Sequence, residues 1–284
     1  MPHVIRTSSL LLCAIIAGTV GGEQACELHT VTFEEGAEGW VGSTGSGGGT
    51  ELEASGGNPD AHLHTTFNDF GITFRNDSNP IYRQNLAVYD EVTIGVDLEV
   101  ESIDFFGTPV TRPWLVEIRD HDDPPAGYQW VSVWYLFDWV GSGEWRSWEV
   151  TIGDPDAVEP PPGWGGTGAE DPETFEPTLP ANRSFASVLA GADEIAFTTL
   201  QPGWGFGFTD FDVRVDNIRF AACLAPGCPG DLDGNGRVDG EDLTRLLGVW
   251  GACGEACPED LDGDGSADGA DLAILLGLWG PCGG

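Results

Sequence analysis

EVTIGVDLEV, residues 91–100, alternates strictly between apolar and polar side chains. Every even-numbered position is valine, isoleucine or leucine, and the odd-numbered positions are acidic, threonine or glycine. A period of two is typical of a β-strand with one face in a core and the other toward solvent. The same alternation recurs at 114–118, 148–152 and 211–215. These runs predict a mainly β protein.

The last of these runs changes phase along the chain. Its apolar positions are odd-numbered up to Val215 and even-numbered from Ile218 onward. Such a slip predicts a β-bulge at Asp216-Asn217. Segments rich in Gly, Pro, Asn and Asp separate the runs, and no amphipathic helix of useful length precedes residue 239. We therefore predict a β-sandwich over residues 26–222.

The composition restricts the partners. Of 284 residues, 47 are Asp or Glu and 11 are Arg, with no lysine, so the formal charge is 11 − 47 = −36. Nucleic acid and anionic membrane surfaces require a basic patch and are excluded as partners. The hydrophobic content of 40% is sufficient for a folded core.

The N-terminus has the pattern of a secretory signal over residues 1–25. Arg6 supplies a positive charge, 10–17 are apolar, and small residues follow up to Ala25. The apolar run is too short to span a bilayer, and no later segment approaches that length. We expect a secreted, extracellular protein, with the cell surface as a second location and no membrane insertion. A buried N-terminal strand or helix is the alternative.

A repeat with a period of 29 residues ends the chain. CPGDLDGNGRVDGEDLTRLLGVWGAC (228–253) matches CPEDLDGDGSADGADLAILLGLWGPC (257–282). Both copies place oxygen-bearing residues at positions 1, 3, 5, 7, 9 and 12 of a calcium loop, with a glycine at position 6 where the chain must turn. We predict two Ca²⁺ ions, and the alternative is a pair of acidic surface turns. The predicted ligands are Asp231, Asp233, Asn235, Arg237, Asp239 and Asp242, then Asp260, Asp262, Asp264, Ser266, Asp268 and Asp271, with Arg237 and Ser266 acting through backbone carbonyls.

An apolar helical stripe follows each loop, and we expect the two stripes to bury each other. Duplicated aspartate-rich loops, Asp at position 12 and a Leu-Leu helix in each half resemble a type I dockerin. The resemblance implies a small all-α domain of two antiparallel loop–helix halves that docks to a cohesin-like or other extracellular protein. The stripes are Leu243, Leu246, Leu247 and Trp250, then Leu272, Leu275, Leu276 and Trp279.

Six cysteines remain once the signal is removed, and an even number in an exported chain favours disulfides. Cys26 precedes the first strand-like segment and Cys223 follows the last, so we predict that they pair. With the antiparallel packing that the dockerin resemblance implies, we expect Cys228–Cys282 and Cys253–Cys257. Pairing within each copy is the alternative.

Short motifs in the large domain resemble jelly-roll sandwiches of the carbohydrate-binding and laminin IV type. They are FEEG (33–36) with GW (39–40), GGNP (56–59), EWRSW (144–148) and VDNIRF (215–220). The resemblance implies a jelly-roll fold and a third calcium ion between the first and last strands. Glu34 and Asp216 are then its candidate ligands. An ordinary surface carboxylate and a bulge residue are the alternative.

The stretch YQWVSVWYLFDWV, residues 128–140, is aromatic on both faces of a predicted strand. One face must enter the core, and the other could stack against sugar rings. Trp130 and Trp134 are the candidates for this role. Alternatively, both faces are buried under residues 153–183, which are dense in Pro, Gly and acids and predict a long surface loop.

Catalytic patterns are weak in this chain. Asp97, Glu99 and Glu101 share a strand face, as the paired carboxylates of glycoside hydrolases do, but we expect a solvated face. His62 and His64 share another face, with no third metal ligand evident.

The expected order is a signal peptide at 1–25, a sandwich at 26–222, a linker at 223–230 and a calcium module at 231–284. We expect a non-catalytic protein that binds a polysaccharide or another extracellular surface and docks through its calcium module. A structural envelope or matrix protein without a glycan ligand, and a polysaccharide-degrading enzyme, are the alternatives.

Overall fold

The computed structural model describes residues 25–224, 230–252, 257–261 and 265–281. The predicted signal peptide (except Ala25) and most of the predicted linker lie outside these ranges, as do Asp262, Asp264 and three of the six cysteines that follow the signal. Within the described ranges, no helix has the length and apolar content that a membrane span requires.

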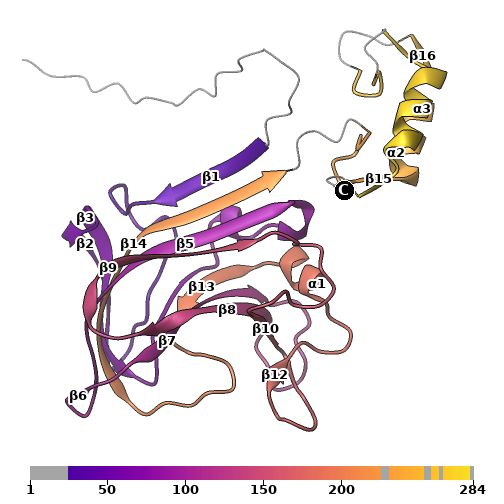
Figure 1. Cartoon of the computed structure of the whole chain (residues 1–284). Helices are drawn as coiled ribbons and strands as arrows, with labels where there is room; N and C mark the ends of the chain where they lie inside the picture. The colour runs from indigo at the N-terminus through magenta and orange to yellow at the C-terminus, as the bar shows by residue number, and fades with distance from the viewer. Residues whose placement is uncertain (1–24, 225–229, 253–256, 262–264, 282–284) are drawn as a thin grey trace, which may run out of the picture.

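Two antiparallel sheets lie face to face, which confirms the β-sandwich (Figure 1). The larger sheet has the order β2-β3-β14-β5-β6, with β1 also paired to β14 and β9 also paired to β5. The smaller sheet has the order β10-β8-β7-β13-β4. The larger sheet contains β1 (Ala25–Val31), β2 (Gly48–Gly57), β3 (Asp60–Asp69), β5 (Glu91–Phe105), β6 (Thr108–Pro109), β9 (Gly143–Ile152) and β14 (Thr209–Leu224). The smaller contains β4 (Thr73–Asn76), β7 (Arg112–Asp120), β8 (Val131–Val140), β10 (Trp164–Thr167) and β13 (Glu194–Thr198).

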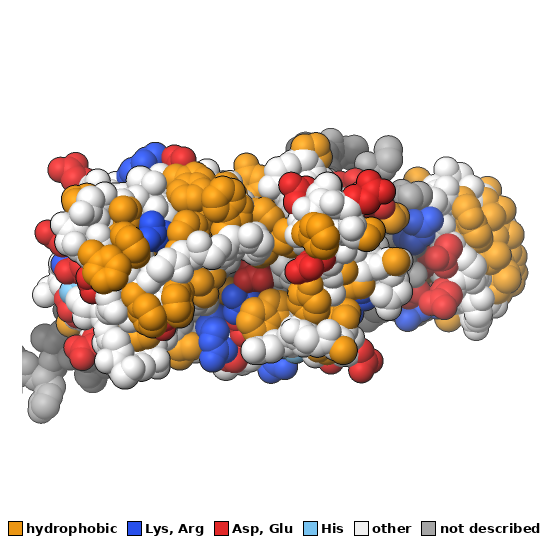
Figure 2. All heavy atoms as spheres, turned by 90° about the horizontal axis from the view of Figure 1, so that it is seen from below, with side chains coloured by type: hydrophobic (Ala, Val, Ile, Leu, Met, Phe, Trp, Pro, Cys, Tyr) orange, Lys and Arg blue, Asp and Glu red, His pale blue; other side chains and the backbone are white. Residues whose placement is uncertain are grey.

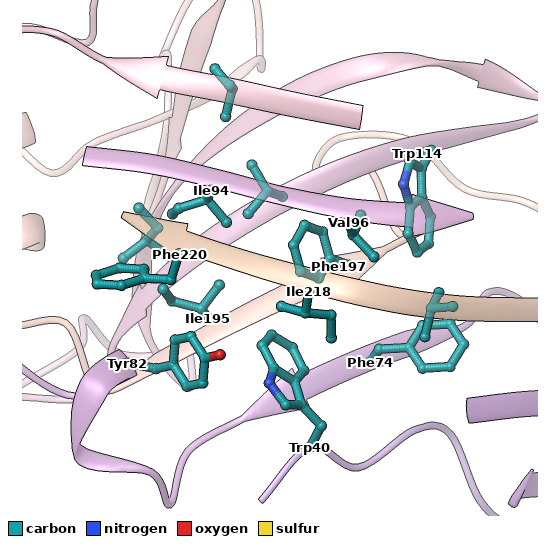
Figure 3. Close-up of a cluster of buried hydrophobic side chains, with 14 of the residues drawn as sticks. Trp40, Phe74, Tyr82, Ile94, Val96, Trp114, Ile195, Phe197, Ile218 and Phe220 are labelled. Carbon is teal, nitrogen blue, oxygen red and sulfur yellow. The ribbon is translucent and has the colours of Figure 1, made fainter. Parts of the chain in front are cut away.

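The core between the sheets takes the side chains that the alternation predicted. Val92, Ile94 and Val96 of β5 are at most 1% exposed. Figure 3 shows Ile94 and Val96 among large aromatic side chains from both sheets and from the loop after β1. Trp40 stacks on Phe197 with ring centroids 5.7 Å apart. The period of two in the sequence therefore gave the correct buried face.

The predicted bulge in β14 is also confirmed. The β14–β5 register shifts between Asp216 and Arg219, and Asn217 has a φ of 46°. Val215 and Ile218 are both fully buried although they are three residues apart. On its other side β14 pairs with β3 up to Val215 and with β1 from Ile218 onward. The bulge therefore lies where β14 changes partners.

The disulfide Cys26–Cys223 forms as predicted. Its two residues lie directly opposite each other in the β1–β14 pair, and the bond spans 197 residues of sequence. It closes the sandwich at its two chain ends.

Residues 153–183 contain more structure than the expected surface loop. β10 adds an edge strand to the smaller sheet, and β11 (Ala169–Glu170) pairs with β12 (Pro177–Thr178) in a short hairpin. The helix α1 (Phe185–Ala190) follows, with Ser184 as its N-cap. Two 3₁₀ turns, Pro80–Tyr82 and Leu86–Val88, precede β5.

The C-terminal repeat forms two similar halves joined by short strand pairs. Asp239 and Asp268 cap α2 and α3 through capping boxes. β15 pairs with β18, and β16 pairs with β17, so the segment after each helix pairs with the loop of the other half. The module therefore contains strand pairs as well as the helices expected for an all-α domain. Its elements are β15 (Arg237–Val238), α2 (Gly240–Gly248), β16 (Gly251–Ala252), β17 (Ser266–Ala267), α3 (Gly269–Gly277) and β18 (Gly280–Pro281).

The helical stripes bury each other only in part, contrary to expectation. Leu246 and Leu275 are fully buried and pack with Val238. Leu243, Leu272 and Ile274 are half-buried, and six further large apolar side chains are at least 39% exposed, because each helix is only nine residues long and supplies one fully buried leucine. They are Leu247, Val249, Trp250, Leu276, Leu278 and Trp279.

Candidate functional site

A cleft of about 790 Å³ opens on the outer face of the smaller sheet. Since Val116 and Ile118 of β7 point into the core, the alternating Glu117 and Arg119 point outward into the cleft. β13 and then β4 add side chains on one side of β7, and loops at 127–130, 175–177 and 200–203 form the walls. Figure 2 looks onto this face from below and shows charged side chains between groups of hydrophobic ones.

The floor of the cleft is a network of paired charges. Arg119 binds Glu117, at 2.6 Å, and Glu194. All three residues are at most 6% exposed. Arg75 of β4 reaches Glu194 at 3.1 Å and also pairs with Asp77. Buried ion pairs contribute little net stability because desolvation offsets their attraction.

Trp130 lines the cleft, and its indole also contacts two residues of the charged floor. Its Nε1 donates to Glu117 at 3.1 Å, and the guanidinium of Arg119 lies 4.2 Å from the centre of its ring. Trp134 is not among the residues that line the cleft. Its indole packs over Gly165 of β10, where a Cβ would lie 2.5 Å from the ring. Of the two candidate tryptophans, only Trp130 therefore lines the cleft.

Two exposed aromatic residues also line the cleft. Tyr128 is 37% exposed and Phe175 is 73% exposed. Phe175 lies at the tip of the β11–β12 hairpin with a φ of 59°. Phe175 was not predicted from the sequence, where the available signal is a lone aromatic residue within the acidic run DPETFEP.

The first C-terminal loop brings its predicted ligands together. One carboxylate oxygen from each of Asp231, Asp233 and Asp242 lies within 4.8 Å of the others. Asp231 accepts N–H groups from Gly234 and Gly236, which folds the loop around its carboxylate. This set of hard oxygen donors fits Ca²⁺.

Asp242 links the start and the end of the first loop through its buried carboxylate. It is fully buried, and it accepts the N–H groups of Leu232 and Asp239 at 2.7 Å each.

The second loop repeats this arrangement where it is described. Asp271 is fully buried and accepts the N–H groups of Leu261 and Asp268 at 2.7 Å each. Asp260 accepts the N–H of Gly265, whose φ of 94° makes the turn. The predicted ligands Asp262 and Asp264 lie outside the described residues.

Three of the predicted disulfide residues, Cys228, Cys253 and Cys282, lie outside the described residues. Cys257 takes part in a disulfide. The β15–β18 pair brings the end of the second half beside the first loop, which is the arrangement on which we based Cys228–Cys282.

Asp216 is not an ordinary surface carboxylate, because it is fully buried at the bulge of β14. It accepts backbone N–H groups from Asn58, at 2.6 Å, and Asn217, at 2.7 Å. Burial raises its pKa to about 6, and the nearby carboxylates of Asp97 and Glu34 add to this effect against the two N–H donors.

Gly57 borders a small cradle of oxygen atoms beside Asp216. A Cβ at this glycine would lie 2.8 Å from Asp216 Oδ2, 2.8 Å from the carbonyl of Asp60 and 2.9 Å from that of Ala61. Glu34 holds the same turn through the N–H of Ala61, at 3.0 Å. Converging oxygens beside a buried carboxylate fit a calcium ion.

The three carboxylates considered for catalysis are held in hydrogen bonds and ion pairs. Asp97 is 4% exposed; burial alone would raise its pKa, but hydrogen bonds from Ser147, Arg219 and Asn217 hold that pKa below its usual value. Glu99 and Glu101 both bind Arg214, at 2.9 and 3.5 Å. They form a charge-paired outer face of the larger sheet.

No protein family matches this chain, and no curated protein matches it. Several solved structures do. The CBM22-2 xylan-binding domain of Paenibacillus barcinonensis Xyn10C is 13% identical, with a TM-score of 0.39 over 68% of this chain and 98% of that domain. The family 11 carbohydrate-binding module of a Clostridium thermocellum cellulosomal cellulase is 14% identical, with a TM-score of 0.42 over 70% of this chain and 97% of the module.

A Clostridium thermocellum xylanase fragment that joins a CBM22-1 module to a GH10 module, complexed with xylohexaose, is 12% identical with a TM-score of 0.38. The match covers 68% of this chain but only 28% of that fragment. At such TM-scores the likeness is broad, and the assignment of function depends on the cleft itself.

Proposed function

We propose that the sandwich binds a neutral polysaccharide in the cleft on the outer face of its smaller sheet, and that the protein is secreted and non-catalytic. The observation that carries this proposal is one cleft with a charge-paired floor and two exposed aromatic residues on its walls. Polar groups at the base and aromatic faces at the sides are the two features that sugar recognition requires.

The chemistry of the floor favours a neutral ligand. Two arginines, Arg75 and Arg119, lie among three carboxylates, those of Asp77, Glu117 and Glu194. The charges therefore nearly cancel, while their oxygen and N–H groups supply acceptors and donors for hydroxyl groups. A polyanion would be repelled by the excess of carboxylates, which Glu170 on the wall increases.

The same network weighs against a glycoside hydrolase in the cleft. Hydrolysis needs one carboxylic acid that gives up its proton and a second carboxylate that acts as base or nucleophile. Glu117 and Glu194 are both bound to Arg119, and Glu117 also accepts hydrogen bonds from Trp130 and Ser132. These contacts suit fixed acceptors better than groups that transfer protons.

Calorimetric titration of the full chain with soluble neutral polysaccharides tests the glycan proposal. We expect Tyr128→Ala and Phe175→Ala each to weaken binding about tenfold, which corresponds to about 1.4 kcal/mol. Phe106→Ala is the matched control, because Phe106 is 85% exposed and does not line the cleft. Absence of binding to every polysaccharide would favour the structural envelope or matrix alternative, and turnover would favour the enzyme.

We further propose that the module at 231–284 binds two calcium ions and docks to another extracellular protein, with a cohesin-like partner as the first candidate. The support is its duplicated surface. Leu247 and Leu276 are 51% and 52% exposed, and Trp250 and Trp279 are each 49% exposed. Figure 2 shows hydrophobic side chains gathered on this module. An apolar surface of this kind is typical of a protein interface.

A pull-down with the full chain, with and without calcium, tests docking. We expect a partner that is retained only with calcium, and that is lost when Trp250 and Trp279 are both changed to serine. If the partner is retained equally without calcium and by the double variant, docking through this surface is contradicted.

We propose the cradle at Gly57 and Asp216, with Glu34, as the site of a third calcium ion in the sandwich.

A further inference from the structure

The outer face of the larger sheet carries a histidine cluster away from the glycan cleft. His62 and His64 alternate on β3, so both point to this face. The neighbouring strand β2 places Glu53 directly opposite His62. From β14, on the other side, Asp212 reaches His64. The register of three strands thus supplies the third ligand that the sequence did not reveal.

The ligand atoms of Glu53, His62 and His64 converge on one point. One such atom from each residue lies within 4.8 Å of the other two. His62 Nε2 is 3.6 Å from one oxygen of Glu53, and His64 Nδ1 is 2.7 Å from the other. The side chain of His62 is 0% exposed, and its Nε2 has no hydrogen-bond partner among the described residues.

The second nitrogen of each ring is occupied in the way that metal-binding histidines require. His62 Nδ1 lies 3.4 Å from the carbonyl of Asp60, which can only accept, so the ring proton belongs on Nδ1 and the lone pair on Nε2. His64 Nε2 lies 2.7 Å from Asp212 and His64 Nδ1 lies 2.7 Å from Glu53. Because a carboxylate can only accept, the metal-free ring carries both protons, and a bound metal ion would take the place of the proton on Nδ1. With that proton displaced, the nitrogens of His62 and His64 and the carboxylate of Glu53 would all face the same metal ion.

We propose that Glu53, His62 and His64 bind a divalent transition-metal ion of the zinc type, with Asp212 as the outer carboxylate that orients His64. Imidazole nitrogens select zinc-like ions over calcium, which prefers oxygen alone. Glu53 is 42% exposed, so the site opens to solvent and leaves a coordination position for water or an external ligand. The ion would also tie β2, an edge strand, to β3.

Calorimetric titration of the full chain with zinc chloride, in saturating calcium so that the oxygen-lined loops are filled, tests the proposal. We expect one zinc equivalent in this background. His62→Gln and Glu53→Gln should each weaken binding more than 100-fold, whereas Asp212→Asn should weaken it by about 10- to 100-fold and preserve the stoichiometry. Glu53→Gln is the safer variant for folding, because the side chain is partly exposed on an edge strand.

His29→Gln is the matched control, since it removes a histidine that pairs with Glu38 outside the cluster. It should leave zinc binding unchanged. X-ray absorption of the zinc-loaded protein should report two imidazole ligands, and one fewer in His62→Gln. The proposal is overturned if the chain takes up no zinc, or if uptake is the same in His62→Gln and Glu53→Gln with their folds intact by circular dichroism.

Discussion

Tyr82 shows what a single buried polar group does in this core. Its side chain is 1% exposed, packs edge-on against Trp40 and Phe220, and has a hydroxyl with no hydrogen-bond partner among the described residues. Burial raises the pKa of Tyr82 to about 12. The chain has no lysine, so tyrosines dominate its titration between pH 9 and 12.

We predict that the free energy of unfolding falls as pH rises from 10 to 12. In this window the unfolded chain loses the Tyr82 proton and the folded chain keeps it, so the raised pKa stabilises the fold below pH 10 and that contribution disappears by pH 12. A shift of two units corresponds to about 3 kcal/mol. Urea unfolding across this range should show the fall in wild type and much less of it in Tyr82→Phe.

Tyr89→Phe is the comparison for that measurement. Tyr89 is half-buried, and burial together with Glu27 raises its pKa. We expect this variant to remove a smaller part of the alkaline fall. An equal fall in wild type and Tyr82→Phe would show that Tyr82 does not control it.

Gly57 gives the sharpest test of the third calcium ion. We predict that Gly57→Ala lowers the free energy of unfolding by about 1–3 kcal/mol, because the added methyl group would contact three oxygens. It should also remove the calcium-dependent rise in the melting temperature of the sandwich. Gly153→Ala is the control, as nothing lies within 4 Å of its Cβ position. A full calcium response in Gly57→Ala would place the ion elsewhere.

At the scale of elements, α2 and α3 depend on the loops that precede them. Each helix has only nine residues, which is too short for stability in isolation. Its N-terminus is fixed by Asp242 or Asp271, whose two carboxylate oxygens both accept N–H groups from the loop region. Metal binding and helix formation should therefore be coupled in this module.

We predict that calcium chelation removes helical circular dichroism while the β-sheet signal remains. Without the ion, the clustered carboxylates repel one another and the helices lose their anchored ends. Asp242→Asn should weaken calcium binding in the first loop. Glu241→Gln, at an exposed acid next to it, should leave binding unchanged. If the helical circular dichroism signal is the same with and without the chelator, calcium binding by these loops is contradicted.

At the scale of the whole molecule, the sandwich is closed by the bond between its first and last strands. Cys26–Cys223 links residues 197 apart in sequence. A cross-link of this span strongly restricts the unfolded chain.

We predict that the double variant Cys26→Ser/Cys223→Ser lowers the free energy of unfolding by about 5 kcal/mol, the loop-entropy value for a span of this length. Guanidinium unfolding measures the loss. Because the β1–β14 ladder also joins these strands, the native sheet should persist in the variant. A change below about 1 kcal/mol would mean that the unfolded chain is already compact at these ends.

The sequence predicted features that depend on neighbours along the chain. Alternation identified the buried face of β5, and its slip located the bulge at Asp216-Asn217. The cleft was beyond prediction because Arg75, Glu117 and Glu194 come from three strands far apart in sequence. Glu53 was missed as a partner of the histidines for the same reason, because the register between β2 and β3 cannot be deduced from the local sequence pattern of either strand.

The crossed strand pairs of the C-terminal module make its two halves interdependent. Each half ends in a segment that pairs with the loop of the other, so a chain truncated after the first copy would leave two backbone edges unmatched. The copies are similar in sequence, and a second truncated chain offers the same complementary edges. Truncation should therefore convert an intramolecular pairing into an intermolecular one, joining two polypeptides through reconstituted modules.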